Sequence, residues 1–97
     1  MKQLGEILKT LREKAGLTQS DAASALGYNT PQFVSNVERS ISYLPVKDLK
    51  KLSELYKSNF EELLEVFIKE KVYLYEQKIR KNAMESFRNI SKDRSKK

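Results

Sequence analysis

The 97-residue sequence contains no cysteine, no histidine and no tryptophan. The absence of cysteine excludes a disulfide framework and a thiolate metal site, and the absence of histidine removes the commonest general base and metal ligand. The sequence also has no glycine-rich phosphate loop and no GxSxG nucleophile motif. We therefore expect no enzymatic activity, no metal and no other cofactor.

Long hydrophobic runs are also missing. No run is long enough to cross a bilayer, and the first ten residues, MKQLGEILKT, are amphipathic and do not resemble a secretory signal. With 39% hydrophobic and 33% charged residues, the chain can bury a modest core and is not typical of a disordered protein. We expect one small cytoplasmic domain with an appended helix and no membrane partner.

The net charge of +6 is concentrated at the C-terminal end of the sequence. Residues 78–97 carry 8 Lys/Arg and 2 Asp/Glu, whereas residues 1–77 carry 11 of each. Attraction between the first 77 residues and a polyanion such as DNA therefore depends on where individual charges lie, because their sum is zero. The basic C-terminal segment can add a general electrostatic attraction.

The spacing of apolar, capping and breaking residues predicts an all-α fold with five helices. Thr18 is a typical N-cap, and Gly27 is a typical residue to end the helix that follows it. Pro31 and Pro45 each fall near the first turn of a later helix, where a proline costs no hydrogen bond. The expected helices cover residues 2–15, 19–26, about 30–38, about 45–57 and from about 59 onward.

The last expected helix has no proline or glycine between Phe60 and Ile90. An apolar stripe with an average spacing of about 3.7 residues runs along its distal part. The stripe consists of Ile68, Val72, Tyr75, Ile79, Ala83, Phe87 and Ile90. Such a stripe needs a partner surface or must fold back on its own domain; we prefer homodimerisation through residues 69–90. Residues 91–97, SKDRSKK, are expected to form a basic disordered tail.

The expected third helix carries amides and hydroxyls on one face where a merely solvated helix usually carries charges. Gln32 and Asn36 can read base edges, because a side-chain amide bonds to N6 and N7 of adenine in the major groove. Ser35 and Pro31 are further candidates for base contact, whereas Phe33 is expected to pack inward. Two short helices joined by a turn, with such a face on the second, are typical of a DNA-reading helix-turn-helix.

Over residues 3–68 the chain resembles the Cro/repressor-type (XRE) helix-turn-helix family. The matching motif residues are Leu17-Thr18-Gln19, Ala23, Leu26-Gly27 and Val34-Ser35-Asn36-Val37-Glu38. Two features depart from the family pattern: the turn from Gly27 to Thr30 is one residue longer than the commonest form, and Ser40 stands where the family usually has glycine. The resemblance implies that residues 1–68 form a phage-repressor-like DNA-binding domain.

The resemblance also implies roles for individual residues. Arg12 would pair with Glu38 and so tie the first helix to the recognition helix, which is a structural role. Gln19 matches a family residue that binds a backbone phosphate, close to N–H groups that favour an anion. Other polar side chains near the two helix ends are expected to contact phosphates. They are Thr18, Asn29, Thr30, Arg39, Ser42, Tyr43 and Lys47.

These observations lead us to interpret the chain as a sequence-specific regulator of transcription that binds double-stranded DNA. We expect a repressor that acts as a homodimer. The expected dimer contacts are Ile68, Val72, Tyr75, Ile79 and Phe87. The alternative is a protein-interaction module, such as an antitoxin or anti-regulator, that binds a partner protein through its C-terminal helix; the neutral N-terminal part and the apolar stripe support it.

Overall fold

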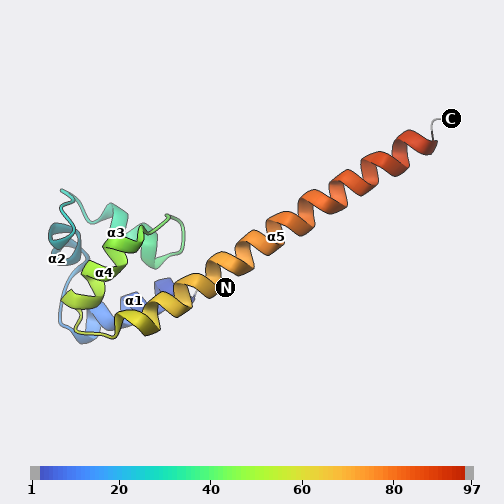
Figure 1. The fold of residues 1–97 in the computed structure, drawn as a ribbon. Helices are drawn as coiled ribbons and strands as arrows, with labels where there is room; N and C mark the ends of the chain where they lie inside the picture. The colour runs from blue at the N-terminus through green and yellow to red at the C-terminus, as the bar shows by residue number, and fades with distance from the viewer. Residues whose placement is uncertain (1–2, 96–97) are drawn as a thin grey trace.

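The computed structural model describes residues 3–95, and within them it has five helices and no strand. The helices are α1 (Gln3–Lys14), α2 (Gln19–Ala25), α3 (Gln32–Glu38), α4 (Val46–Leu55) and α5 (Phe60–Ser95). The first four helices pack with the beginning of α5, and the rest of α5 projects from them as a rod (Figure 1). The molecule measures 65 × 27 × 19 Å along its principal axes. The predicted all-α fold with an extended last helix is confirmed.

Capping residues set the helix ends. The Thr18 hydroxyl accepts a hydrogen bond from the Asp21 amide at 3.0 Å, and the Asp21 carboxylate accepts one from the Thr18 amide at 2.9 Å. This capping box lowers the pKa of Asp21, because the backbone N–H stabilises the charged carboxylate. Gly27 follows α2 with a φ of +87°, a conformation that favours glycine. At the start of α5 the Asn59 side chain accepts a bond from the Glu62 amide at 3.1 Å.

Both prolines lie one position before a helix. Pro31 is the N-cap of α3 and Pro45 is the N-cap of α4, so these helices begin at Gln32 and Val46, one or two residues later than expected. Neither proline can cap with its side chain, and their role is to fix φ where the chain enters the helix. The helix α4 ends two residues earlier than expected, because Lys57 adopts a left-handed conformation with φ of 53°.

The core lies where α1 to α4 meet the first turns of α5. Leu8 and Leu49 are fully buried, and Ala22 and Ala23 allow α2 to approach its neighbours closely because their side chains are small. Full burial of a large apolar side chain contributes about 1.5–3 kcal/mol to stability. The buried hydrophobic residues are Leu4, Leu8, Ala22, Ala23, Leu26, Val34, Val37, Leu44, Leu49, Leu52, Tyr56, Leu63 and Phe67.

Gly5 lets α1 touch the backbone at the end of α3. A Cβ atom at this position would lie 2.6 Å from the carbonyl oxygen of Glu38 and 2.8 Å from that of Val37. Such distances cannot be relieved by rotating a side chain, because both contacts are with backbone. Glycine at position 5 therefore fixes how closely α1 supports the C-terminal end of α3.

Only the beginning of α5 belongs to the core. Leu63 and Phe67 are buried in it, and one turn later the Glu70 carboxylate accepts a hydrogen bond from the Leu4 amide at 3.2 Å. Beyond this tie, every residue from 72 to 90 is exposed, so the apolar stripe does not fold back on its own domain. Among the described helices, none is long and apolar enough to cross a membrane.

The end of α5 differs from the expected tail. The helix continues to Ser95, so residues 91–95 are helical where we expect disorder, and residues 96–97 lie outside the described part of the chain. No proline or glycine occurs within α5, and each residue added to an existing helix gains one hydrogen bond. Polarity alone is therefore a weak signal for where this helix ends.

Candidate nucleic-acid interface

The helix α3 has one buried face and one polar face. Val34, Val37 and Glu38 are buried against α1 and α2. On the opposite side Gln32 is exposed, while Asn36 one turn later is half-buried. The same spacing that fixes the inner face thus places both predicted base-reading amides on the outer face.

The two amides and an arginine are joined to one another. The Gln32 side chain donates from Nε2 to Oδ1 of Asn36 at 3.0 Å, and Arg39 donates from Nη2 to the same oxygen at 2.9 Å. An amide oxygen has two lone pairs, so Oδ1 of Asn36 is fully used. Gln32 keeps its own Oε1 and its second Nε2 hydrogen, which are the two groups that bond to adenine. Asn36 therefore orients Gln32 and Arg39, and retains only donor capacity of its own.

A buried ion pair on the inner face of α3 links this helix to α1. Arg12 donates to Glu38 through Nε at 2.7 Å and Nη2 at 3.1 Å, and through Nη1 to the Leu17 carbonyl at 2.8 Å. The arginine and glutamate side chains are only 9% and 3% exposed. The hydrogen bond with Glu38 raises the pKa of Arg12. The ion pair implied by the family resemblance is thus present, and it links α1 to the last residue of α3.

Gln19 belongs to the same network. Its Nε2 donates to Oε1 of Glu38 at 2.9 Å, and the side chain is half-buried at the start of α2. The second Nε2 hydrogen of Gln19 is left for another acceptor, such as a phosphate oxygen. Glu38 of α3 therefore accepts hydrogen bonds from both Arg12 of α1 and Gln19 of α2.

Aromatic packing fixes the turn between α2 and α3. The rings of Tyr28 and Phe33 are 4.5 Å apart between centroids, and Tyr28 donates its hydroxyl hydrogen to the Asp48 carboxylate at 3.2 Å. Phe33 is half-buried against the core, on the inward side that we expect. These contacts attach the longer turn to α4.

The loop after α3 is held close to its end. Ser40 has a φ of 61°, which explains why the resembling family usually has glycine here. The amide of Ile41 donates to the Asn36 carbonyl at 2.8 Å, and Tyr43 extends into solvent with 62% of its surface exposed. The Lys71 ammonium of α5 lies 4.5 Å from the centroid of the Tyr43 ring.

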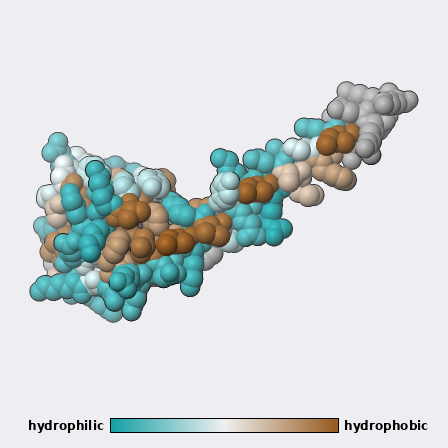
Figure 2. Space-filling model, viewed as in Figure 1, coloured by the Kyte–Doolittle hydropathy of each residue, from teal (hydrophilic) through white to brown (hydrophobic). Residues whose placement is uncertain are grey.

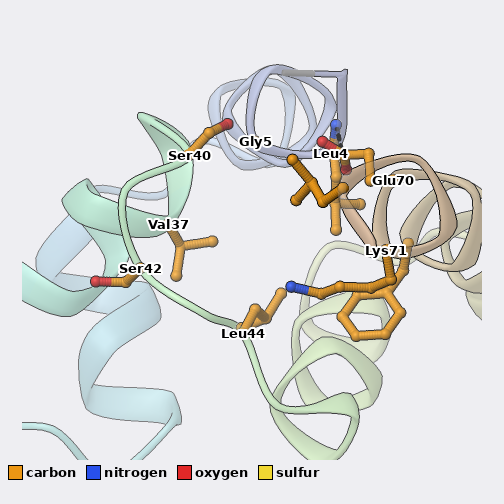
Figure 3. A pocket seen from close by; sticks show the side chains of 10 residues that line it. Leu4, Gly5, Val37, Ser40, Ser42, Leu44, Glu70 and Lys71 are labelled. Carbon is orange, nitrogen blue, oxygen red and sulfur yellow. Dashed lines mark hydrogen bonds between the residues drawn. The ribbon is translucent and has the colours of Figure 1, made fainter. Parts of the chain in front are cut away.

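A crevice of about 300 Å³ lies between α1, this loop and α5 (Figure 3). Its lining includes Ser42 and Leu44 from the loop and Glu70 and Lys71 from α5. Sequence reasoning missed Lys71, because no periodic signal shows which side of a long helix faces a loop. The structure thereby adds one cation beside the expected phosphate-contacting segment.

Near α3 the carboxylates of Glu38 and Asp48 are hydrogen-bonded within the protein, whereas two cations are exposed. Glu38 is paired with Arg12, and Asp48 is buried and accepts from Tyr28, so neither carboxylate presents a free charge to solvent. Arg39 at the end of α3 and Lys47 in α4 are both exposed. Of the other predicted contact residues, Ser35 lies within α3 and is half-buried. Thr18, Asn29, Thr30 and Pro31 precede α3 and are exposed, and Ser42 follows it and is half-buried.

A family model described as "Helix-turn-helix" matches residues 8–63, more than half of the chain. The chain belongs to the Cro/repressor-type helix-turn-helix family. Neither the curated proteins nor the solved structures gave a match.

Membership in the helix-turn-helix family supports a DNA-binding helix-turn-helix regulator. The matched range contains α2, the turn, α3 and α4, and it ends at residue 63 within the buried beginning of α5. The exposed stretch from residue 72 to residue 90 lies outside this range. The family match therefore covers most of the packed domain and does not extend to the projecting part of α5.

Proposed function

We propose that this protein is a sequence-specific repressor that binds double-stranded DNA as a homodimer, with α3 in the major groove. The observation that carries the proposal is the exposed Gln32 side chain, which is oriented by Asn36 and keeps one acceptor and one donor free. A bidentate amide contact with adenine needs that pair of groups.

Residues on both sides of α3 support this docking. Thr18 and Gln19 stand at the start of α2, while Arg39, Tyr43 and Lys47 are exposed at and beyond the end of α3. Contacts of such residues with phosphates fix the register of a recognition helix without reading sequence. Asn29, Thr30 and Ser42 extend the same two flanks, and Ser35 and Pro31 adjoin Gln32 as further base contacts.

The proposed dimer rests on the exposed part of α5. Its apolar stripe residues Ile68, Val72, Tyr75, Ile79 and Phe87 are 43% to 66% exposed in a single copy. A second copy that covers them removes apolar surface from water and doubles the number of recognition helices on one DNA molecule. In the proposed mechanism the bound dimer represses transcription by occupying the promoter.

Selection from a random duplex pool tests the proposal. At fixed moderate salt the 97-residue protein is expected to enrich one short motif, present as an inverted repeat because a symmetric dimer reads two half-sites. The enriched motif should contain an A·T pair at a position that changes preference when Gln32 is replaced. A pool that remains random after repeated rounds would contradict the proposal.

The exposed stripe also supports a second candidate, a module that binds a partner protein through α5. Sedimentation of the purified protein distinguishes the two. A dimer that enriches a motif supports the repressor, whereas a monomer that enriches none supports the protein-binding module.

A further inference from the structure

We infer that two copies pair through α5 in antiparallel orientation, with the two-fold axis at Ile79 and the DNA-binding domains at opposite ends of a rod. This inference rests on the proposed homodimer and specifies its geometry. It assigns a contact surface and a partner orientation to the part of the chain that lies outside the matched family range.

The apolar stripe is nearly symmetric about Ile79. Ile68 and Ile90 lie 11 residues before and after it, a distance of about three helical turns, so the three isoleucines lie on one line. Tyr75 and Ala83 lie four residues before and after it. An antiparallel partner therefore places Ile79 on Ile79, Ile68 on Ile90, and the large Tyr75 on the small Ala83.

A parallel pair would match the same residues less well. Tyr75 would then meet Tyr75 and Ala83 would meet Ala83, which gives a bulge and a gap 8 residues apart along the seam. Close packing disfavours both, because overfilled and underfilled positions each cost stability. Val72 and Phe87, seven residues before and eight after the centre, also come opposite each other only in the antiparallel pair.

Charge along α5 favours the same orientation. Residues 61–67 contain three glutamates and no Lys/Arg, whereas residues 91–97 contain four Lys/Arg and one aspartate. The antiparallel pair directs the basic end of each α5 towards the acidic beginning of the other. A parallel pair would instead place two copies of residues 78–90, each with four Lys/Arg and one glutamate, side by side.

The face that the partner would cover is free. Glu61 and Glu65 lie 18 and 14 residues before Ile79, which is close to a whole number of turns, so they continue the line of the stripe; both are exposed. Leu63 and Phe67 point the other way, into the domain. Figure 2 shows hydrophobic side chains recurring along the projecting part of α5. A partner helix can therefore lie along α5 without displacing the domain.

The arrangement sets the distance between the two domains. Residue 60 is 19 residues from Ile79, or about 28 Å at 1.5 Å per residue, so the two α5 helices begin about 57 Å apart. One turn of DNA spans about 34 Å. The half-sites of the operator are therefore expected to lie more than one turn apart.

Disulfide cross-linking tests the orientation, and the chain has no native cysteine to interfere. The variants are Ile68→Cys and Ile90→Cys. Both positions are exposed in a single copy, so neither substitution removes core packing. Each variant is produced alone. The two variants are also co-expressed, with a size tag on one of them, and all samples are then mildly oxidised. Gln77→Cys, an exposed position on the opposite face of α5, is the control.

We expect a covalent dimer only when Ile68→Cys and Ile90→Cys are present together, and only monomer from either variant alone or from the control. Covalent dimers of each variant with itself would overturn the antiparallel pairing and leave the homodimer standing as a parallel one. A protein that sediments as a dimer but cross-links in none of these mixtures would overturn pairing through this stripe. A monomer in sedimentation would overturn both the homodimer and its geometry.

Discussion

Replacing Arg12 with methionine is expected to lower the free energy of unfolding by about 3–5 kcal/mol, because Glu38 remains buried without its charged partner. The Glu38 side chain is 3% exposed, and Gln19 supplies only one neutral hydrogen bond in place of the lost ion pair. Single domains of this kind have total stabilities of about 5–15 kcal/mol. The variant should therefore lose a large part of its stability, and urea denaturation monitored by circular dichroism should show a midpoint at a clearly lower urea concentration.

The double variant Arg12→Met, Glu38→Met is the matched control. It removes both charges and keeps apolar volume in the same place, so it should recover most of the stability lost in the single variant. This comparison separates the cost of an unpaired charge from the cost of altered packing. A single variant that loses less than about 1 kcal/mol would contradict the role of this pair as the support of α3.

Replacing Ile79 with aspartate is expected to convert the dimer into a monomer and to lower operator affinity by about 10²–10⁴-fold. In the antiparallel pair the two Ile79 side chains meet at the axis, so the substitution places two carboxylates together in an apolar seam. The Ile79 side chain is 48% exposed in a single copy, and the folded domain should therefore keep its stability. Sedimentation and binding titrations at one salt concentration measure the two effects.

Gln77→Asp provides the control for this variant. It adds the same charge two residues away, on the opposite face of α5. It should remain dimeric and bind the operator nearly as the unsubstituted protein does. If Ile79→Asp remains dimeric at micromolar concentration, the stripe is not the dimer contact.

Much of the domain could be predicted because its signals are local. Thr18, Gly27 and the two prolines mark helix ends through backbone chemistry, and the periodic leucines identify the inner faces. The five-helix fold is accordingly confirmed, with starts and ends displaced by one or two residues. The distal end of α5 was not predictable from composition, because a polar segment without a breaker can continue a helix.

The finer arrangement of the interface could not be predicted, because it depends on contacts between distant segments. The sequence pattern does not distinguish the amide of Gln32 from that of Asn36. In the structure, Asn36 accepts hydrogen bonds from both Gln32 and Arg39. The closeness of Gly5 to the end of α3 and the placement of Lys71 beside Tyr43 also arise only when α1 and α5 pack. A single sequence contains no periodic signal for such contacts.

The central claim is that Gln32 reads a base, and a titration of Gln32→Ala at fixed salt tests it most directly. The duplex would be the selected operator, together with versions that carry single base-pair changes, and Gln77→Ala would serve as a control at an exposed glutamine far from α3. We expect Gln32→Ala to bind the operator about 5–150-fold more weakly and to lose preference at one base pair, while Gln19→Ala weakens binding with unchanged preference. Unchanged affinity and preference in Gln32→Ala would contradict the account.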